Sequence, residues 1–244
     1  MALLSFQHVS KRDRDGRREV SVLTDVSFDI DAGEYVGLWG VRRSGKSTLL
    51  RLAAGIETPD DGAIIFDGND LAQMGTEERV AQRRSGGIAL ALLGLSPKGN
   101  RPVVEHIAWP VVGFGASWDE AEAVARRVLK RVGASDIEDA RTGELGSSEC
   151  VRVELARALA HEPRLLLVDE PAILASPSEA RELYALLRLL GRDKGLAVVI
   201  ASREAHALEG APRILTVDNG RVRSTDSRRK VLPFRRSGSE PSAS

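Results

Sequence analysis

The clearest chemical pattern in the chain is residues 40–47, which read GVRRSGKS and match G-x4-G-K-[ST]. The pattern follows an apolar run and precedes a helical one. Backbone N–H groups in such a loop, with the positive end of the following helix dipole, can bind phosphate oxygens. Lys46 would then neutralise the β- and γ-phosphates, and Ser47 would coordinate Mg²⁺. We therefore expect a nucleoside triphosphate site here, rather than a plain glycine turn capped by Ser47.

Two acids end a continuous apolar run at residues 165–170, LLLVDE. Such a run is typical of a buried parallel strand, so the acids lie where that strand ends. Asp169 would hold Mg²⁺ through water, and Glu170 could polarise an attacking water as a general base. Acids at strand ends are common, but together with the glycine loop they favour nucleotide hydrolysis over a solvated loop acid at Glu170.

Charge balance and cysteine content exclude several other classes of protein. Lys plus Arg number 35 and so do Asp plus Glu, so bulk charge does not attract nucleic acid, and we expect no nucleic-acid partner. Cys150 is the only cysteine, which rules out an internal disulfide framework and a cysteine-based zinc site. The four histidines show no metal-ligand spacing. They are His8, His106, His161 and His206.

The apolar runs of the chain are short. The longest, residues 88–93 and 196–201, fall far below the roughly 20 residues that a membrane-spanning helix needs. Residues 1–6 have neither a basic region nor an apolar stretch long enough for a secretory signal. We expect the chain to stay in the cytoplasm.

The glycine loop needs a strand before it and a helix after it, and the surrounding pattern supplies both. Short β-like runs precede it at residues 3–9, 20–28 and 35–39. The charged residues 11–19 between the first two runs predict a solvated hairpin loop. A helical pattern begins at Ser47 and stops at Gly55, and residues 62–68 return to β.

Helices and strands alternate further along the chain, which predicts an α/β fold with a mostly parallel sheet. The expected helices cover residues 117–132, 148–160 and 177–190, and the expected strands cover 164–168, 196–200 and 213–218. Ser117 is the predicted N-cap of the first of these helices, and Glu120 completes its capping box. Residues 223–244 are basic and rich in Ser and Pro, which predicts a disordered tail.

These motifs together resemble the nucleotide-binding subunit of an ABC transporter. The resemblance covers residues 3–222 and includes the stretches KSTLLRLAAGIETPDDGAIIFDG and ARALAHEPRLLLVDEP. It implies an ABC-type P-loop NTPase domain over residues 1–222, with a mostly parallel core sheet and an N-terminal antiparallel β subdomain. The distance along the chain from Lys46 to Asp169 leaves room for a helical subdomain at about residues 91–160. Among subfamilies, the chain is most similar to the lipoprotein-release, macrolide-efflux and cell-division type.

The resemblance implies a role for each motif residue, with ATP and Mg²⁺ as cofactors. The nucleotide would be bound by Gly40, Arg42, Arg43, Ser44, Gly45, Lys46, Ser47 and Thr48. Catalysis would depend on Glu170 and Arg203, and the metal on Ser47 and Asp169. The signature segment, which in the family completes the site of a partner subunit, would be Leu145, Gly146, Ser147, Ser148 and Glu149.

Several motifs depart from the family pattern at positions that act on ATP. Arg43 replaces the middle glycine of the loop, which places a Cβ and a cation where backbone meets phosphate. The aromatic residue that stacks on adenine falls near Arg12 or Asp13, so that platform is missing unless Arg12 stacks in its place. Ala91 stands at the Q-loop glutamine, and its side chain cannot reach the metal.

The remaining departures lie in the signature segment and beyond it. Gly146 replaces a serine, and Ser147 and Ser148 replace two glycines, which impairs anion binding at that helix N-terminus. Ser176 stands at the D-loop aspartate. Arg203 replaces the switch histidine, which keeps a cation but removes its tunable proton. We therefore predict a nucleotide holder with weak hydrolysis rather than a fast ATPase.

Two functions follow from the resemblance. The first is an ATP-binding subunit that drives or regulates a separate integral membrane subunit from the inner face of the cell membrane. It would act as a homodimer or, because both composite sites would be weakened, as a heterodimer with a more competent sister chain. The second is a regulator of the same fold that binds ATP to switch a cell-envelope partner. A GTPase or nucleoside kinase is disfavoured because the chain lacks an N-K-x-D motif and a kinase-like lid.

Residues 91–114 are the expected docking segment for the membrane subunit, because in the family this region lines a groove for a short helix of that subunit. Large apolar side chains lie here among Pro97, Gly99 and Pro110, and so irregular a stretch is not expected to bury them all. Trp109 is the predicted anchor. The alternative is that Trp109 closes the core of the helical subdomain.

Overall fold

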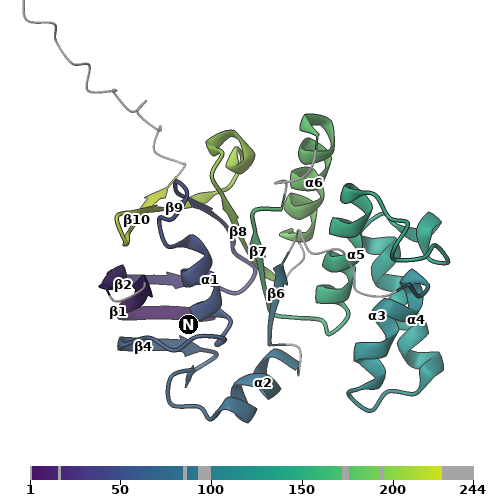
Figure 1. Ribbon diagram of the computed structural model, residues 1–244, viewed down its shortest axis with the longest axis horizontal. Helices are drawn as coiled ribbons and strands as arrows, with labels where there is room; N and C mark the ends of the chain where they lie inside the picture. Colours follow the sequence, from purple (N-terminus) through teal and green to yellow (C-terminus); the bar gives the residue numbers. More distant parts are fainter. Residues whose placement is uncertain are drawn as a thin grey trace, which may run out of the picture.

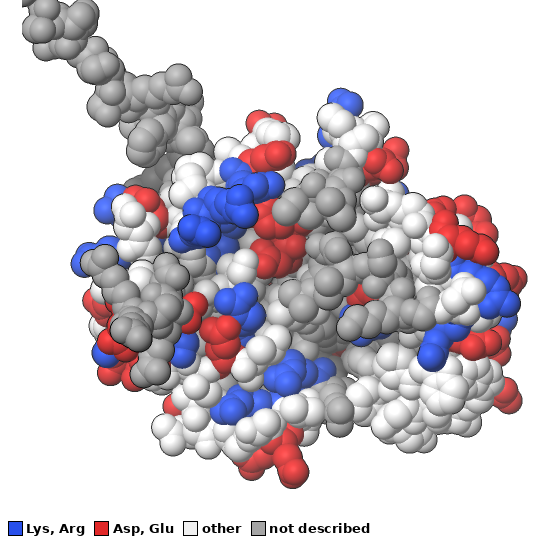
Figure 2. Space-filling view, in the orientation of Figure 1, with Lys and Arg blue, Asp and Glu red and all other residues white. Residues whose placement is uncertain are grey.

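The computed structural model describes residues 2–15, 18–84, 87–92, 100–171, 176–192 and 195–226. These residues form an antiparallel sheet, a larger mostly parallel sheet and helices around both (Figure 1). The predicted combination of a mostly parallel core sheet with an N-terminal antiparallel sheet is confirmed. On the face seen in Figure 2, acidic and basic side chains are interspersed, as the balanced composition predicts.

The antiparallel sheet has the strand order β2-β1-β4-β5. Its strands are β1 (Leu4–Asp15), β2 (Arg18–Ile30), β4 (Asp61–Phe66) and β5 (Asn69–Asp70). The prediction of a solvated loop over residues 11–19 is wrong, because Arg12 pairs with Ser21 and Asp13 with Val20 in the β1–β2 ladder. Charged side chains do not prevent strand pairing in a hairpin arm that projects into solvent, since they stay hydrated while the backbone groups are satisfied.

The core sheet has the order β10-β9-β3-β8-β7-β6. Its strands are β3 (Tyr35–Trp39), β6 (Ile88–Leu92), β7 (Leu165–Asp169), β8 (Ala197–Ser202), β9 (Arg213–Asp218) and β10 (Arg221–Asp226). All neighbours are parallel except β9 and β10. The nearly continuous burial of β7 and β8 follows from helices covering both faces of a parallel sheet.

Strand β10 corrects the predicted start of the tail. The turn at Asn219 and Gly220 has positive φ at both residues (46° and 73°), the geometry that Asn-Gly favours in a two-residue hairpin. It returns the chain antiparallel to β9, so residues 223–226 belong to the sheet. The rest of the predicted tail, residues 227–244, lies outside the described residues.

Two hydrophobic clusters lie on opposite faces of the core sheet. Helix α1 (Lys46–Ala53) packs with the antiparallel sheet on one face, where Leu165 and Leu167 of β7 are buried. On the other face, Leu166 and Val168 pack against α3 (Val103–Val112), α4 (Trp118–Arg131), α5 (Ser147–Leu159) and α6 (Pro177–Leu190). This alternation along β7 is what a strand buried on both faces requires. Figure 1 shows α3, α4 and α5 grouped on the far side of the core sheet from β1 and β2.

The helices follow the sequence pattern closely at their ends. Ser117 caps α4 by accepting the N–H of Glu120, whose carboxylate accepts the N–H of Ser117, so the predicted capping box is confirmed. The remaining described helices are α2 (Thr76–Arg84) and two short 3₁₀ turns, Ser135–Ile137 and Ala205–Leu208. In the described part of the chain, none of the helices combines the length and apolar character needed to cross a membrane.

The expected docking segment is more regular than predicted. Ala91 lies in β6, residues 93–99 fall outside the described residues, and residues 103–112 form α3 with Pro110 inside it. Trp109 is 51% exposed, and its ring lies edge-on to that of Trp118 at 5.5 Å. The alternative that Trp109 closes a core is therefore wrong, because half of the side chain remains in solvent. The docking role stays a prediction.

Candidate functional site

Three neighbouring strands bring the residues of the candidate site to one edge of the core sheet. β3, β8 and β7 are adjacent and parallel, with Trp39 opposite Ser202 and Asp169 opposite Ala201. Their carboxyl ends therefore meet at one edge, where ligands bind in open α/β sheets. The loop that follows Trp39 leads into α1, so the glycine loop, Asp169 and Glu170 share this edge.

The loop backbone needs small residues at two positions. Gly45 has φ 108°, and a Cβ there would lie 2.9 Å from Leu23 Cδ2 and 3.1 Å from the Val22 carbonyl. At Gly40, a Cβ would lie 2.5 Å from Ser44 Oγ. Arg43, where the resembling family has glycine, itself adopts φ 62°. The loop thus keeps a left-handed residue at this position, at a cost of about 1–2 kcal/mol for a side chain with a Cβ.

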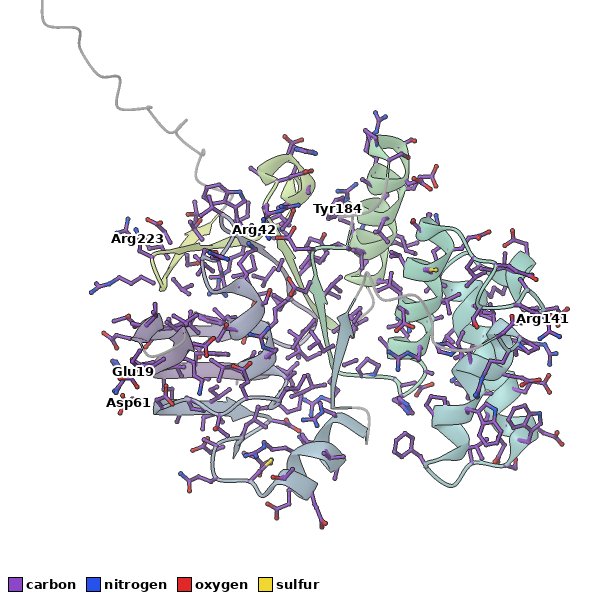
Figure 3. All side chains as sticks on the ribbon, viewed as in Figure 1. Glu19, Arg42, Asp61, Arg141, Tyr184 and Arg223 are labelled. Carbon is purple, nitrogen blue, oxygen red and sulfur yellow. The ribbon has the colours of Figure 1, made fainter. Side chains whose placement is uncertain are left out.

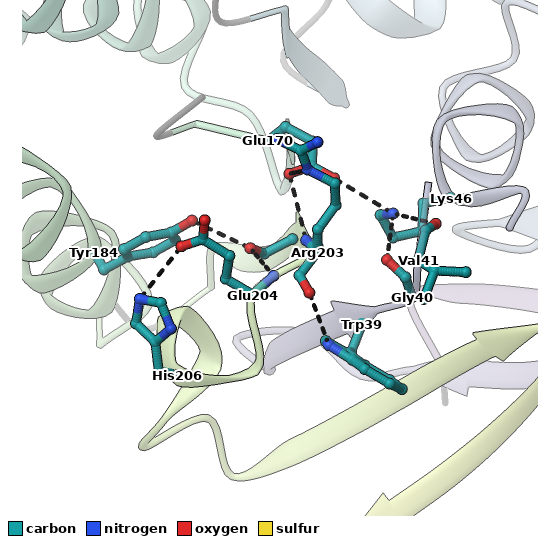
Figure 4. A network of polar contacts seen from close by, with 10 residues as sticks. Trp39, Gly40, Val41, Lys46, Glu170, Tyr184, Arg203, Glu204 and His206 are labelled. Carbon is teal, nitrogen blue, oxygen red and sulfur yellow. Dashed lines mark hydrogen bonds and ion pairs between the residues drawn. The ribbon is translucent and has the colours of Figure 1, made fainter. Parts of the chain in front are cut away.

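The Lys46 ammonium is buried and held in a fixed position. Only 6% of its side chain is exposed. Its Nζ donates to the carbonyl oxygens of Gly40 at 2.7 Å and Val41 at 3.1 Å, and lies 3.3 Å from Glu170 Oε1 (Figure 4). Carbonyl dipoles and one carboxylate together compensate a charge that burial alone would disfavour.

Glu170 lies between two cations. Its other oxygen, Oε2, is 3.5 Å from Arg203 Nε and accepts the Arg203 backbone N–H at 3.3 Å. The Glu170 backbone has φ 46°, and its N–H donates to the Ala201 carbonyl at 3.0 Å, so the strand end fixes its direction. The sequence did not reveal that Lys46, Glu170 and Arg203 form one network, which is drawn in Figure 4.

A second group of polar contacts supports the segment that carries Arg203. The Trp39 indole Nε1 donates to the Arg203 carbonyl at 3.1 Å. Ser202 Oγ accepts the Glu204 N–H at 3.1 Å and lies 3.4 Å from the Tyr184 hydroxyl. Burial raises the pKa of Tyr184, which therefore stays protonated and able to donate at neutral pH. Trp39 and Tyr184 are supporting residues that motif analysis missed, because neither belongs to a motif.

Asp169 has the geometry expected of a metal ligand. Its Oδ1 is buried and has no hydrogen-bond partner among the described residues. A buried carboxylate oxygen without a donor is expensive, and a hydrated cation would satisfy it. Ser47, the other predicted ligand, lies at the start of α1 on the wall of the adjacent pocket. The residues present therefore fit a Mg²⁺ site.

A cavity of about 650 Å³ opens beside the loop. The glycine loop and the start of α1 contribute Arg43, Ser44, Gly45, Lys46, Ser47 and Thr48 to its wall. The β1–β2 hairpin and the β9–β10 turn contribute Asp13, Val20, Ser21, Val22, Asn219 and Gly220. Arg12 is not among the lining residues, and its guanidinium instead contacts Asp61 at 3.4 Å. The suggestion that Arg12 replaces the missing aromatic platform is therefore wrong.

The residues that line the cavity outside the glycine loop were largely missed by sequence analysis. Strand β2 contributes Val20, Ser21 and Val22, and the β9–β10 turn contributes Asn219 and Gly220. This turn lies against β2, since the Thr24 N–H donates to the Gly220 carbonyl at 2.8 Å. The Asn-Gly dipeptide was a usable turn signal, but only the strand order shows where that turn lies.

The signature segment lies apart from the residues that line this cavity. Its residues 145–149 lead into α5, where the Glu149 carboxylate accepts the Gly146 N–H at 2.7 Å and Ser147 is the first helical residue. Ser176 caps α6 by accepting the Glu179 N–H at 3.4 Å. Ala91 is buried in β6 opposite Val168. The structure thus places Ala91 on the strand beside the one that carries Asp169, whereas the signature segment and Ser176 do not line the cavity that contains Lys46.

Comparisons with known proteins agree on the relationship. Residues 23–173 match the family described as ABC transporter. The chain is 32% identical over 218 residues to the methionine import ATP-binding protein MetN of Corynebacterium jeikeium, with 89% of this chain and 59% of that protein covered. It is 33% identical over 220 residues to the lipoprotein-releasing system ATP-binding protein LolD of Bordetella pertussis, with 90% of this chain and 94% of that protein covered.

A solved structure shares the fold. The ATP-binding cassette MJ0796, solved as a dimer in a post-hydrolysis state bound to ADP and Pi, superposes with a TM-score of 0.82 at 24% identity, covering 91% of this chain and 98% of that one. The chain spans only 59% of the length of the methionine import relative. Import and lipoprotein-release proteins match at nearly the same identity. The similarity therefore does not select one transport class.

Proposed function

Because this chain belongs to the ABC transporter family as an ATP-binding cassette, we propose that it binds Mg-ATP in the cavity beside residues 40–48 and drives or regulates a separate membrane subunit. The observation that carries the proposal is the buried Lys46 ammonium, which two carbonyls fix on the wall of the cavity. A cation held in this way is ready to bind phosphate oxygens without first being ordered.

Each residue of the site has a distinct task in this proposal. Backbone N–H groups of the loop and the α1 N-terminus bind the phosphates, and Lys46 exchanges its contact with Glu170 for phosphate oxygens. Ser47 and Asp169 would hold Mg²⁺, which would neutralise charge on the phosphates. Glu170, once Lys46 has turned to the nucleotide, accepts a proton from the attacking water.

We further propose that hydrolysis is slow. Ala91 is buried in β6 and presents no polar group that could position the water. Arg203 Nε lies 3.5 Å from the Glu170 carboxylate, so the proposed general base must leave a permanent cation before it can receive a proton from water. Loss of groups that position the attacking water raises the activation free energy of hydrolysis by several kcal/mol.

The proposed partners are an integral membrane subunit and a second nucleotide-binding subunit. The signature segment at the start of α5 lines no part of this chain's own cavity, which supports a site completed by a second subunit. Because Gly146, Ser147 and Ser148 depart from the usual pattern, a heterodimer is favoured over a homodimer. Trp109 and Trp118 are 51% and 38% exposed, which supports docking of a membrane subunit on α3 and α4. The site of action is then the inner face of the membrane.

The second candidate is a regulator that binds ATP and switches a cell-envelope protein without powering transport. The Glu170–Arg203 contact favours it, because a carboxylate held by a permanent cation suits long-lived nucleotide binding better than rapid turnover. Co-purification separates the two candidates. An integral membrane protein with a transport pore supports the first, and a partner without one supports the second.

Calorimetry with Mg-ATP tests the binding proposal directly. We expect affinity in the micromolar to millimolar range, weakened when EDTA removes Mg²⁺. The Asp169→Asn variant should lose most of this Mg²⁺ dependence, because the amide is a poor partner for metal-bound water. The absence of ATP binding by a chain whose fold is verified by circular dichroism contradicts the proposal. So does an affinity that is the same with and without the metal.

A further inference from the structure

The peptide group between Arg203 and Glu204 is held on both of its sides. Its carbonyl oxygen accepts the Trp39 indole Nε1–H at 3.1 Å (Figure 4), and its N–H donates to Ser202 Oγ at 3.1 Å. The preceding N–H, that of Arg203 itself, donates to Glu170 Oε2 at 3.3 Å. Side chains from the ends of β3, β8 and β7 therefore fix the backbone on both sides of the Arg203 Cα.

Trp39 combines a packed ring with a single polar atom. Its backbone pairs with Ser202 in the parallel β3–β8 ladder, so the carbonyl that it reaches belongs to the next residue of β8's chain. The ring is partly buried against the hydrophobic cluster on the α6 side of the core sheet. An indole N–H can only donate, and the Arg203 carbonyl is its acceptor. Phenylalanine at this position would keep much of the packing and lose this hydrogen bond.

Arg203 presents two donors to one oxygen of Glu170. Its backbone N–H lies 3.3 Å and its Nε 3.5 Å from Oε2, whereas Oε1 faces Lys46. A bound phosphate can compete with Glu170 for Lys46, but it does not remove Arg203 from the carboxylate. The φ and ψ angles of Arg203 set the positions of both donors, and the Trp39 hydrogen bond restricts these angles.

We propose that Trp39 is a positioning residue whose indole N–H keeps Arg203 on the Glu170 carboxylate and thereby slows hydrolysis. Trp39 is not among the residues that line the described cavity, so it acts through Arg203. The inference rests on the proposed function, in which Glu170 has to leave Arg203 before it accepts a proton from water. Loss of the Trp39 hydrogen bond should make hydrolysis faster, which is the opposite of what damage to the site would do.

The segment stays attached to the sheet when residue 39 has no N–H to donate. Ser202 Oγ still accepts the Glu204 N–H, and the Tyr184 hydroxyl of α6 (Figure 3) lies 3.4 Å from the same oxygen. Ala207 and Leu208, in the turn that follows, are buried. We therefore expect Trp39→Phe to loosen Arg203 within a folded chain.

NMR of the nucleotide-free full chain tests the positioning. The Arg203 Nε–H signal, identified by its absence in Arg203→Ala, should exchange with water about threefold or more faster in Trp39→Phe, because its contact with Glu170 is formed less often. Trp39→Met also lacks a donor and should agree with Trp39→Phe. Tyr35→Phe is the matched control, since it removes one polar hydrogen from the aromatic residue at the other end of β3.

Two results of this measurement overturn the inference. One is an Arg203 exchange rate that stays at the wild-type value in either Trp39 variant. The other is an equal acceleration in the Tyr35 control, which would show that any loss from an aromatic residue of β3 loosens Arg203.

Steady-state phosphate release from Mg-ATP tests the consequence. Trp39→Phe should raise kcat about threefold or more, the expected worth of one hydrogen bond, and should change KM by less than about twofold. In an Arg203→Ala background the same substitution should leave kcat unaltered, because the side chain that Trp39 positions is absent.

The kinetic outcomes separate this inference from the proposed function. A kcat that is equal to or below the wild-type value in Trp39→Phe, undetectable rates included, overturns the inference. So does a rise that persists in the Arg203→Ala background. Failure of the folded wild type to bind Mg-ATP contradicts the proposed function instead.

Discussion

Glu170 and Glu154 each lie between two basic side chains, but the two sites differ in whether a ligand can reach those side chains. Glu170 contacts Lys46 and Arg203 at the edge of the core sheet, and 21% of its side chain is exposed. Glu154 of α5 accepts from Arg157 Nε at 2.9 Å and lies 3.4 Å from His106 Nε2, with only 7% of its side chain exposed.

The difference between the two sites is access. His106 belongs to α3, so the Glu154 contacts join two helices of the group that covers one face of the core sheet. Lys46, in contrast, lines a cavity that a phosphate can enter. The same local chemistry therefore holds helices together in one region and provides an exchangeable contact in the other.

The largest expected effect is on turnover by Glu170→Gln. The amide cannot accept a proton from water, so phosphate release should fall by about a hundredfold or more while ATP affinity is retained. Steady-state phosphate release and calorimetry measure the two quantities. Glu154→Gln is the control and should keep the wild-type rate. An equal loss of turnover in both variants would remove the distinction between the two regions.

The next effect is on stability, where we expect the Glu154 substitution to have the larger effect of the two. Glu154→Ala leaves the largely buried His106 ring without its acceptor and also removes the partner of Arg157, whose side chain is 44% exposed, which should lower the free energy of unfolding by about 1–3 kcal/mol. Glu170→Ala should cost less, because Lys46 keeps its two carbonyl acceptors. Urea denaturation compares them. A larger loss in the Glu170 variant contradicts the structural role given to Glu154.

A smaller effect is expected from pH. Burial alone would raise the pKa of Glu154, but the hydrogen bond from His106 and the charge of Arg157 outweigh it and hold this pKa below its ordinary 4.5. A group with a lowered pKa in the folded state stabilises above its unfolded pKa, and that stabilisation is lost as pH falls through the folded pKa. The wild type should therefore lose stability in acid more steeply than Glu154→Gln.

The capping glutamates Glu120 and Glu179 also have lowered pKa values, because Ser117 and Ser176 donate hydrogen bonds to them. They titrate in both proteins, so the difference between wild type and Glu154→Gln isolates Glu154. Melting temperatures of both proteins between pH 6 and pH 3 would measure this difference. Parallel curves for the two proteins would show that the Glu154 contacts carry no pH-dependent stability.

The smallest expected effect concerns the loop that presents Lys46. Arg43→Gly removes a Cβ at φ 62° and should raise the free energy of unfolding by up to about 1 kcal/mol, although glycine also makes the unfolded chain more flexible. Arg42→Gly is the matched control, since Arg42 is not among the residues with positive φ, and it should be slightly destabilising. Destabilisation by Arg43→Gly would show that the loop holds Arg43 without strain.

Local patterns predicted the parts of the site that depend on neighbours in sequence. The turn from β3 into α1 and the acids that end β7 were visible because a glycine loop and a buried apolar strand each leave a contiguous signal. The Ser117 capping box was visible for the same reason. Contacts between distant segments were not, because the Glu170–Arg203 and Trp39–Arg203 contacts depend on β8 lying between β3 and β7.

Composition gave wrong predictions at charged, solvent-exposed segments, where a strand tolerates polar side chains. The charges at residues 11–19 indicated a loop, yet the backbone pairs and the hairpin carries Asp13 to the cavity. Residues 223–226 looked like a tail because sequence composition does not register the return from Asn219 and Gly220 to β9. Prolines near Trp109 suggested an irregular stretch, although α3 accommodates Pro110 within its last turn.

The most direct test of the account is the affinity of Lys46→Ala for ATP, measured by calorimetry beside Lys130→Ala. Lys130 is an exposed lysine of α4 outside the cavity, so its variant should bind as the wild type does. If Lys46 binds phosphates, its loss should weaken ATP binding by about ten- to a hundredfold. Wild-type affinity in Lys46→Ala would contradict the assignment of the nucleotide to this cavity.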